Sequence, residues 1–269
     1  MTELVSADGT RVAYEVVGEG PAVVLVDGAM CFRDSGPMRA LAAELVGSAT
    51  KTGCSAVLYD RRGRGRSGDT LPYAIDREID DLAALVDAVG GRAALFGMSS
   101  GGALAALAAA RLGDAVSTLV VFEPPYLPEQ DRLEASAYTA ELTRALAAGD
   151  RDAAVAAFLA RVGVPLQGVE GMKRSPAWAG MTAIAPTLGY DDAVMGDSAV
   201  PSAAAAITAP TLALAGGASP DFLRWGARAL AGAVPGARFE VLEGQGHDVD
   251  PVPLAAAIRG AIGARGGSI

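Results

Sequence analysis

Short apolar runs alternate with longer amphipathic stretches along almost the whole chain. The apolar runs have about the four- to eight-residue length of strands buried in a sheet. We expect strands at residues 11–17, 22–26, 55–59, 92–96, 116–122, 211–215 and 238–242. Helical periodicity predicts helices at residues 38–46, 75–89, 103–111, 221–233 and 253–264. Strands that alternate with helices in this way predict an α/β fold, with a mostly parallel sheet covered on both faces.

The alternation stops between residues 126 and 209. This segment has no strand-like run, and its pattern predicts helices at residues 129–148 and 151–162. It begins at the carboxyl end of an expected strand, where ligands bind in open α/β sheets. We therefore expect a core of residues 1–125 and 210–269 and a helical lid of residues 126–209 over the active site. A cap with a structural role only is the alternative.

Composition narrows the class of protein. The chain has 269 residues, 51% of them apolar, which suits one large globular domain with an insertion. The net charge of −9 argues against nucleic-acid or membrane partners, because no basic cluster offsets it. We expect a cytoplasmic protein, since the pattern shows neither a signal segment nor a membrane-spanning apolar run. Dinucleotide and P-loop motifs and His/Cys metal clusters are lacking too, so we expect no cofactor and no metal.

One motif carries candidate chemistry. Residues 97–101 read Gly-Met-Ser-Ser-Gly, a Gly-x-Ser-x-Gly sequence between an expected strand and an expected helix. On such a sharp turn a serine projects its hydroxyl above the sheet, and the two glycines allow close packing. A serine hydroxyl needs a base to take its proton, and His247 is the only histidine of the chain. Ser99 and His247 therefore predict a serine hydrolase.

The arginine run and the two cysteines could suggest other chemistry. The arginine run DRRGRGRS at residues 60–67 is interleaved with glycine, which favours a structured turn over a phosphate site. Cys31 and Cys54 do not form a disulfide framework. Cys31 follows an expected strand end and is a candidate for the wall of the site, but as a nucleophile it would compete with Ser99 for the same histidine.

Four segments of the chain resemble the α/β-hydrolase superfamily. They read VLVDGA at 24–29, YDRRGRGRS at 59–67, GMSSG at 97–101 and GQGH at 244–247. The resemblance extends nearly end to end and implies the α/β-hydrolase fold, with a helical lid after the sixth strand. The superfamily includes esterases, lactonases, thioesterases, perhydrolases, C–C hydrolases and acyltransferases. Members that open epoxides or displace halide normally use aspartate as nucleophile, so Ser99 disfavours those reactions.

The chain departs from the superfamily pattern at the acid of the catalytic triad. Most members carry this acid about three residues after a glycine beyond the next-to-last strand, where this chain has Ser219. Asp221 stands two residues later, and Glu123 ends the strand after the nucleophile helix. The Glu123 layout resembles the fungal lactonases that hydrolyse zearalenone, which also share Asp27-Gly28 and the doubled serine. We expect Glu123 to orient His247, with Asp221 as the alternative acid.

The same layout implies an oxyanion hole and a substrate pocket. A tetrahedral intermediate needs two N–H donors, for which Ser100 at the helix start and either Gly28 or Ala29 are the candidates. An apolar pocket should lie between the lid and the core. Its candidate residues are Cys31, Tyr126, Trp178, Met181 and Tyr190.

These expectations combine into one function. We expect a hydrolase that cleaves a small-molecule carboxylic ester or lactone with an apolar body through an acyl-enzyme intermediate. C–C bond hydrolysis or acyl transfer with the same triad is the alternative reaction. A ligand-binding pseudo-hydrolase is the alternative class of protein.

Overall fold

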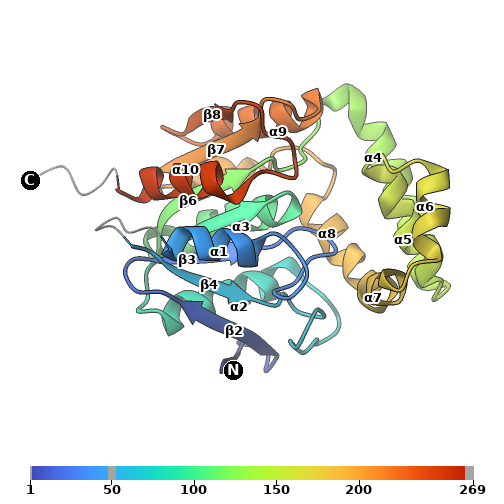
Figure 1. Ribbon diagram of the computed structural model, residues 1–269, viewed down its shortest axis with the longest axis horizontal. Coiled ribbons are helices and arrows are strands. Elements are labelled where there is room, and N and C mark those ends of the chain that lie inside the picture. Colours follow the sequence, from blue (N-terminus) through green and yellow to red (C-terminus); the bar gives the residue numbers. More distant parts are fainter. Residues whose placement is uncertain (1, 48–52, 264–269) are drawn as a thin grey trace, which may run out of the picture.

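An eight-stranded sheet forms the centre of the computed structural model, which describes residues 2–47 and 53–263. The strands are β1 (Thr2–Val5), β2 (Arg11–Val17), β3 (Ala22–Val26), β4 (Ser55–Tyr59), β5 (Ala93–Met98), β6 (Val116–Phe122), β7 (Thr211–Gly216) and β8 (Arg238–Leu242). Their order in the sheet is β1-β2-β4-β3-β5-β6-β7-β8 (Figure 1). Strands β3 to β8 are parallel to one another. Strands β1 and β2 form an antiparallel edge. This sheet confirms the expected α/β fold.

Helices cover both faces of the sheet. Two helices pack on one face, α1 (Met38–Val46) and α10 (Pro251–Gly263). Three pack on the other, α2 (Ile75–Ala88), α3 (Ser100–Leu112) and α9 (Asp221–Ala233). Every residue of β3 and β5 is buried, because helices exclude water from both sides of these central strands.

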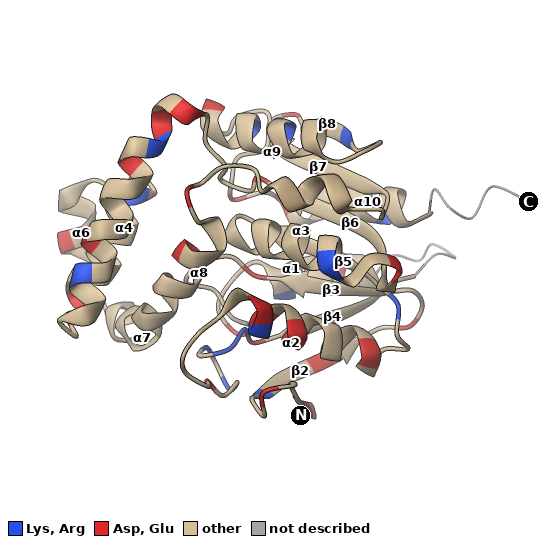
Figure 2. Cartoon of the chain, turned by 180° about the vertical axis from the view of Figure 1, so that it is seen from behind, with Lys and Arg blue, Asp and Glu red and all other residues tan. Residues whose placement is uncertain are grey.

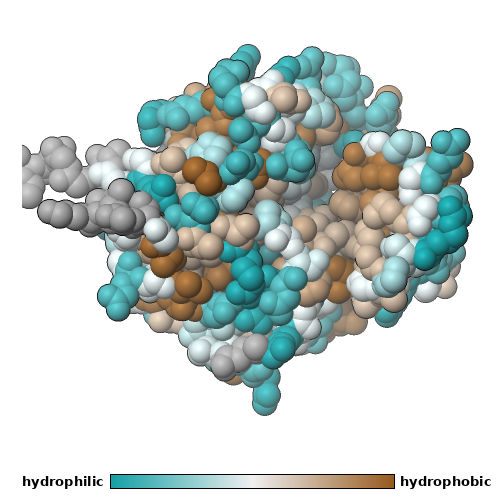
Figure 3. Space-filling model, viewed as in Figure 1, coloured by the Kyte–Doolittle hydropathy of each residue, from teal (hydrophilic) through white to brown (hydrophobic). Residues whose placement is uncertain are grey.

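The segment between β6 and β7 forms a separate layer of helices beyond the carboxyl ends of the strands (Figure 1). We call residues 126–209 the helical insert. Its helices are α4 (Arg132–Ala147), α5 (Arg151–Arg161), α6 (Leu166–Lys173), α7 (Ala177–Ile184) and α8 (Leu188–Met195). The insert has an apolar cluster of its own, against which Ala29 and Met30 of the loop after β3 pack. Figure 3 shows a hollow between the insert and the rest of the molecule, bordered by apolar residues of the insert.

Helix α3 and strand β1 show how the elements differ from those that the sequence pattern predicts. Helix α3 begins at Ser100 rather than at residue 103. Gly101 and Gly102 have low helix propensity, but both are buried where the helix meets the sheet, and this packing outweighs propensity. The pattern does not predict β1 either, because most of its residues are exposed and only its pairing with β2 defines it.

Candidate active site

Ser99 stands at the sharp turn between β5 and α3. Its φ of 56° lies in a region that residues other than glycine rarely adopt. A Cβ atom at Gly97 would lie 2.3 Å from the carbonyl oxygen of Gly101, and one at Gly101 would lie 2.3 Å from that of Val26. Both motif glycines are therefore needed for the close approach that holds Ser99, whose side chain is half-buried, at the end of the sheet.

A fully buried carboxylate lies beside the only imidazole. Glu123 directly follows β6 and is 0% exposed. Its Oε2 lies 2.6 Å from Nδ1 of His247, and its Oε1 accepts a 2.7 Å hydrogen bond from the backbone N–H of Gly216. An ionised Glu123 places the proton of a neutral imidazole on Nδ1, which leaves Nε2 free to accept a proton.

Backbone hydrogen bonds hold the ends of three neighbouring strands together at this site. The N–H of Ser99 donates to the carbonyl of Phe122 at 2.9 Å, and the N–H of Glu123 donates to that of Leu214 at 3.0 Å. Phe122 also stacks on His247, with 6.3 Å between the ring centroids. Ser99 and Glu123 thus extend from adjacent strands, and His247 approaches on the loop after β8.

Asp221, the alternative acid, and Ser219, which occupies the usual acid position, have other surroundings. The Asp221 side chain is 93% exposed at the start of α9, where it pairs with Arg224. Ser219 is buried, and its hydroxyl lies close to Gly216. The structure therefore brings Glu123, and not Asp221, to His247.

The loop after β3 lies directly against the turn that carries Ser99. A Cβ atom at Gly28 would lie 3.1 Å from the Cβ of Ser99. Ser100 begins α3, and the N-terminus of a helix favours negative charge. No backbone carbonyl within residues 2–47 and 53–263 accepts a hydrogen bond from the N–H of Ala29 or of Ser100. Gly28, Ala29 and Ser100 thus belong to the two segments that adjoin Ser99.

Two titratable groups belong to this loop. Asp27 is 2% exposed, and its Oδ1 has no hydrogen-bond partner among the residues that the structure describes. Burial raises the pKa of Asp27 to about 7. Burial, together with the charge of Asp27, raises the pKa of the Cys31 thiol to about 12. Cys31 is therefore a neutral thiol near pH 7 and is a poor nucleophile beside Ser99.

The arginine run after β4 forms a structured turn with buried charges. Arg61, Arg62 and Arg64 are at most 1% exposed. Arg61 binds Glu78 through two hydrogen bonds of 2.6 and 3.0 Å, and Arg62 binds Asp81 through two of 2.8 Å. Figure 2 shows basic and acidic residues side by side where this loop meets α2. The turn is thus built on ion pairs within the protein.

The structure places the five expected pocket residues in different surroundings. Tyr126 is 1% exposed in the core, and Trp178 is buried in the cluster of the insert, where its indole N–H donates to Asp152. Met181 packs on the same cluster. Tyr190 of α8 stacks on Tyr73 with ring centroids 4.0 Å apart and donates to Asp69 at 2.6 Å. Cys31 is half-buried in the loop after β3.

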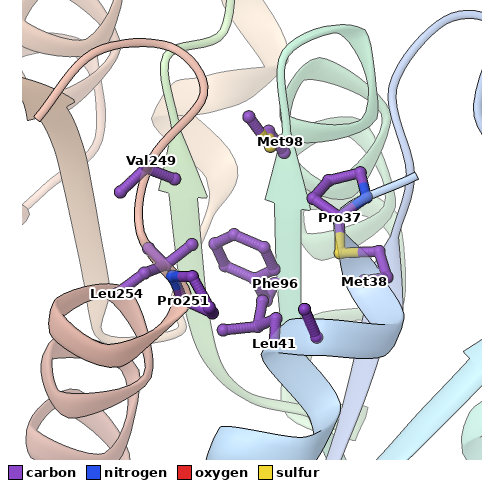
Figure 4. Close-up of a pocket in the computed structure, with 9 residues that line it drawn as sticks. Pro37, Met38, Leu41, Phe96, Met98, Val249, Pro251 and Leu254 are labelled. Carbon is purple, nitrogen blue, oxygen red and sulfur yellow. The ribbon is translucent and has the colours of Figure 1, made fainter.

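A small apolar cavity lies between α1 and α10, next to the site in sequence. Its volume is about 170 Å³. Met98, which precedes Ser99, and Val249, two residues after His247, line it together with Phe96, Leu41 and Leu254 (Figure 4). The sequence signal for this cavity is weak, because its lining comes from apolar positions that read as ordinary core.

Two properties of residues 2–47 and 53–263 bear on metal ions and membranes. No group of three or more His, Cys, Asp or Glu side chains in this part of the chain is placed to hold a metal ion. None of the helices formed by these residues is both long and apolar enough to cross a membrane.

Comparison with known proteins places the chain in a family. Residues 22–257 match the model of the alpha/beta hydrolase family, and the chain belongs to this family. An alpha/beta hydrolase from Sphaerobacter thermophilus is 45% identical, with a TM-score of 0.83 over 96% of this chain and 99% of that one. A thermophilic esterase from Thermogutta terrifontis is 23% identical, with a TM-score of 0.66 over 96% of each chain. An enol-lactonase from Burkholderia xenovorans is 22% identical, with a TM-score of 0.61 over 97% and 98%. None of the curated proteins matches the chain.

Proposed function

We propose that this alpha/beta hydrolase is a serine hydrolase that cleaves a carboxylic ester or lactone with an apolar body. The observation that carries the proposal is the 2.6 Å contact between His247 and the buried carboxylate of Glu123. A buried carboxylate that binds Nδ1 orients the imidazole and stabilises the imidazolium formed during attack. The strained turn that presents Ser99 on the neighbouring strand end supports the same reaction.

Acylation begins when Oγ of Ser99 attacks the carbonyl carbon of the substrate. Nε2 of His247 takes the hydroxyl proton, and Glu123 stabilises the resulting imidazolium. The carbonyl oxygen becomes an anion, which the N–H of Ser100 and that of Gly28 or Ala29 stabilise. The intermediate then expels the alkoxide oxygen, which receives the proton from His247, and the acyl group remains on Ser99.

Deacylation repeats these steps with water as the nucleophile. His247 takes a proton from water, the hydroxide adds to the acyl carbonyl, and Ser99 leaves with the proton. An ester yields an acid and an alcohol, whereas a lactone yields one hydroxy acid because its leaving oxygen stays attached to the acyl part. The hollow below the helical insert suits an apolar substrate body, so we propose that the insert is the lid of the site (Figure 3).

Covalent labelling tests the nucleophile. A fluorophosphonate reacts with activated serines, and mass spectrometry of the digested protein should locate the adduct on Ser99. Ser99→Ala should remain unlabelled and lose several orders of magnitude in kcat, because the members of a triad act as a unit. Ser136→Ala changes an exposed serine of α4 and should be labelled like the wild type. A wild type without the adduct, or Ser99→Ala with substantial activity, contradicts the proposal.

The bond that is cleaved is tested with paired substrates. Lactones and open-chain esters with the same number of carbon atoms are compared by kcat/KM, from small to large acyl groups. An acyl-enzyme that accumulates should release p-nitrophenol in a burst from p-nitrophenyl esters. A preference for either series identifies the enzyme as an esterase or a lactonase, whereas no turnover of any member contradicts both.

A further inference from the structure

Asp191 of helix α8 is a buried carboxylate that the reaction above does not use. It is 5% exposed and accepts hydrogen bonds from three side chains that come from two other parts of the fold. Its Oδ1 accepts from Arg61 at 2.6 Å and from the hydroxyl of Ser100 at 2.8 Å. Its Oδ2 accepts from Arg64 at 2.5 Å. One carboxylate of the helical insert thus joins the arginine turn after β4 to the start of α3.

The two arginines that bind Asp191 also bind the loop after β3. Arg61 donates to the carbonyl of Asp27 at 3.1 Å, and Arg64 donates to the carbonyl of Gly28 at 2.6 Å. The carbonyl of Asp27 shares a peptide unit with the N–H of Gly28. The carbonyl of Gly28 shares one with the N–H of Ala29. Because a trans peptide unit is planar, its C=O and N–H point in opposite directions, and fixing the carbonyl fixes the N–H.

These contacts bear on both halves of the oxyanion hole. A charged donor on a peptide carbonyl polarises that unit and strengthens its N–H as a donor. The Ser100 hydroxyl that binds Asp191 belongs to the residue whose backbone N–H is the other candidate donor of the oxyanion hole. We propose that Asp191, acting through Arg61, Arg64 and Ser100, is a positioning residue that sets the oxyanion hole. This inference rests on the proposed function, because it assumes that Ser99 reacts beside these donors.

The charges of the network support a positioning role and argue against a proton-transfer role. Although burial by itself would raise it, the charges of Arg64 and Arg61 hold the pKa of Asp191 below its ordinary value. An ionised carboxylate can accept from all three side chains at once. Because Asp191 lies on α8, the helical insert contributes a carboxylate to the network that binds these loops.

Two matched pairs of variants test the role. Asp191→Asn removes the shared acceptor, and Asp192→Asn changes the next residue of the same helix, whose carboxylate accepts from Thr139. Arg64→Lys keeps the charge but loses the fork that reaches Asp191 and Gly28 together. Arg62→Lys makes the same change at a buried arginine whose hydrogen bonds go to Asp8, Asp81 and Arg77.

We measure kcat, KM and the rate of fluorophosphonate labelling for each folded variant. Asp191→Asn and Arg64→Lys should lower kcat and the labelling rate by at least about tenfold, because each weakens stabilisation of the oxyanion. KM should change by less than about threefold, since the ground-state carbonyl gains little from this site. Asp192→Asn and Arg62→Lys should stay within about twofold of the wild type in kcat. A merely structural role would lower the activity of Arg62→Lys as much as that of Arg64→Lys.

Wild-type kcat and labelling rates in Asp191→Asn and Arg64→Lys overturn the proposal, and so does a loss confined to KM. If neither variant folds, Ser100→Ala decides, because it removes only the hydroxyl bond to Asp191 and leaves every charge paired. A loss of about threefold or more in its kcat then supports the role, and an unchanged kcat overturns it. A wild type that is not labelled at Ser99 contradicts the proposed function itself. Labelling of Ser99 at equal rates in all variants contradicts only the role of Asp191.

Discussion

The carboxylate of Glu123 and the imidazole of His247 lie 2.6 Å apart, although the helical insert and two strands separate them along the chain. Glu123 reaches this position from the end of β6, one strand from the nucleophile turn. Its second oxygen binds the N–H of Gly216, at the end of the next strand. The acid is therefore held by the sheet itself, which suits the precise orientation that an imidazole base requires.

Two isosteric substitutions test which acid serves His247. Glu123→Gln removes the charge that orients the imidazole, and we expect a loss of at least about 10²-fold in kcat. Asp221→Asn changes an exposed carboxylate paired with Arg224 and should cost less than about tenfold. Initial rates with a p-nitrophenyl ester measure both variants, and circular dichroism checks their folding. The opposite ranking would assign the acid to Asp221.

The nucleophile turn depends on the absence of a side chain at Gly101. In Gly101→Ala the new Cβ would lie 2.3 Å from the carbonyl oxygen of Val26, which belongs to the sheet and has no room to move. We expect a loss of about 2 kcal/mol or more in the free energy of unfolding, together with loss of activity. Gly180→Ala is the control, because a Cβ there meets no atom within 4 Å on helix α7. It should be neutral or stabilise by up to about 1 kcal/mol, as measured by urea unfolding.

Asp27 makes the stability of the protein depend on pH. Burial raises its pKa to about 7, and its ordinary value is 3.8. Between these values the folded protein keeps a proton that the unfolded chain has lost, so the free energy of unfolding falls as the pH rises. Above pH 7 the decrease in the free energy of unfolding is complete and amounts to about 4 kcal/mol.

Asp27→Asn removes this titration. We expect the variant to be more stable than the wild type at pH 8, by up to about 4 kcal/mol, and close to the wild type at pH 4. Denaturant unfolding at both pH values measures the two differences. Asp87→Asn, at an exposed position of α2, should show the same small difference at each pH. An effect of Asp27→Asn that is the same at both pH values would contradict the raised pKa of Asp27.

The buried ion pair between Arg62 and Asp81 should matter far more for stability than the partly exposed pair that the neighbouring Asp80 of α2 forms with Arg111 of α3. Asp81→Asn leaves the Arg62 guanidinium buried with weaker compensation, and we expect a loss of about 3 to 5 kcal/mol. Asp80→Asn breaks the partly exposed pair with Arg111 and should cost less than about 1 kcal/mol. Equal losses in thermal or urea unfolding would show that burial does not govern these pairs.

The local sequence pattern predicts much of the fold and part of the candidate site. Residues 97–101 predict a strand-to-helix turn because its requirements are local: two glycines, a serine and flanking elements of the right length. The alternation of apolar runs and helical stretches likewise predicts the parallel sheet, since each element must bury an apolar face against its neighbours. The preference for Glu123 over Asp221 also came from the sequence, through its place at a strand end.

The tertiary structure decided what depends on contacts between distant segments. The arginine run reads only as a turn, because its partners Glu78, Asp81 and Asp191 lie elsewhere in the chain and no local rule pairs them. The sequence pattern could not place Trp178 in the apolar cluster of the insert or Tyr126 in the core of the sheet domain. Apolar side chains follow the same pattern whether they line a pocket or fill a core, and only packing separates the two. The link from Asp191 to the loop beside Ser99 exists because folding buries these charges together, where each needs the other to offset the loss of water.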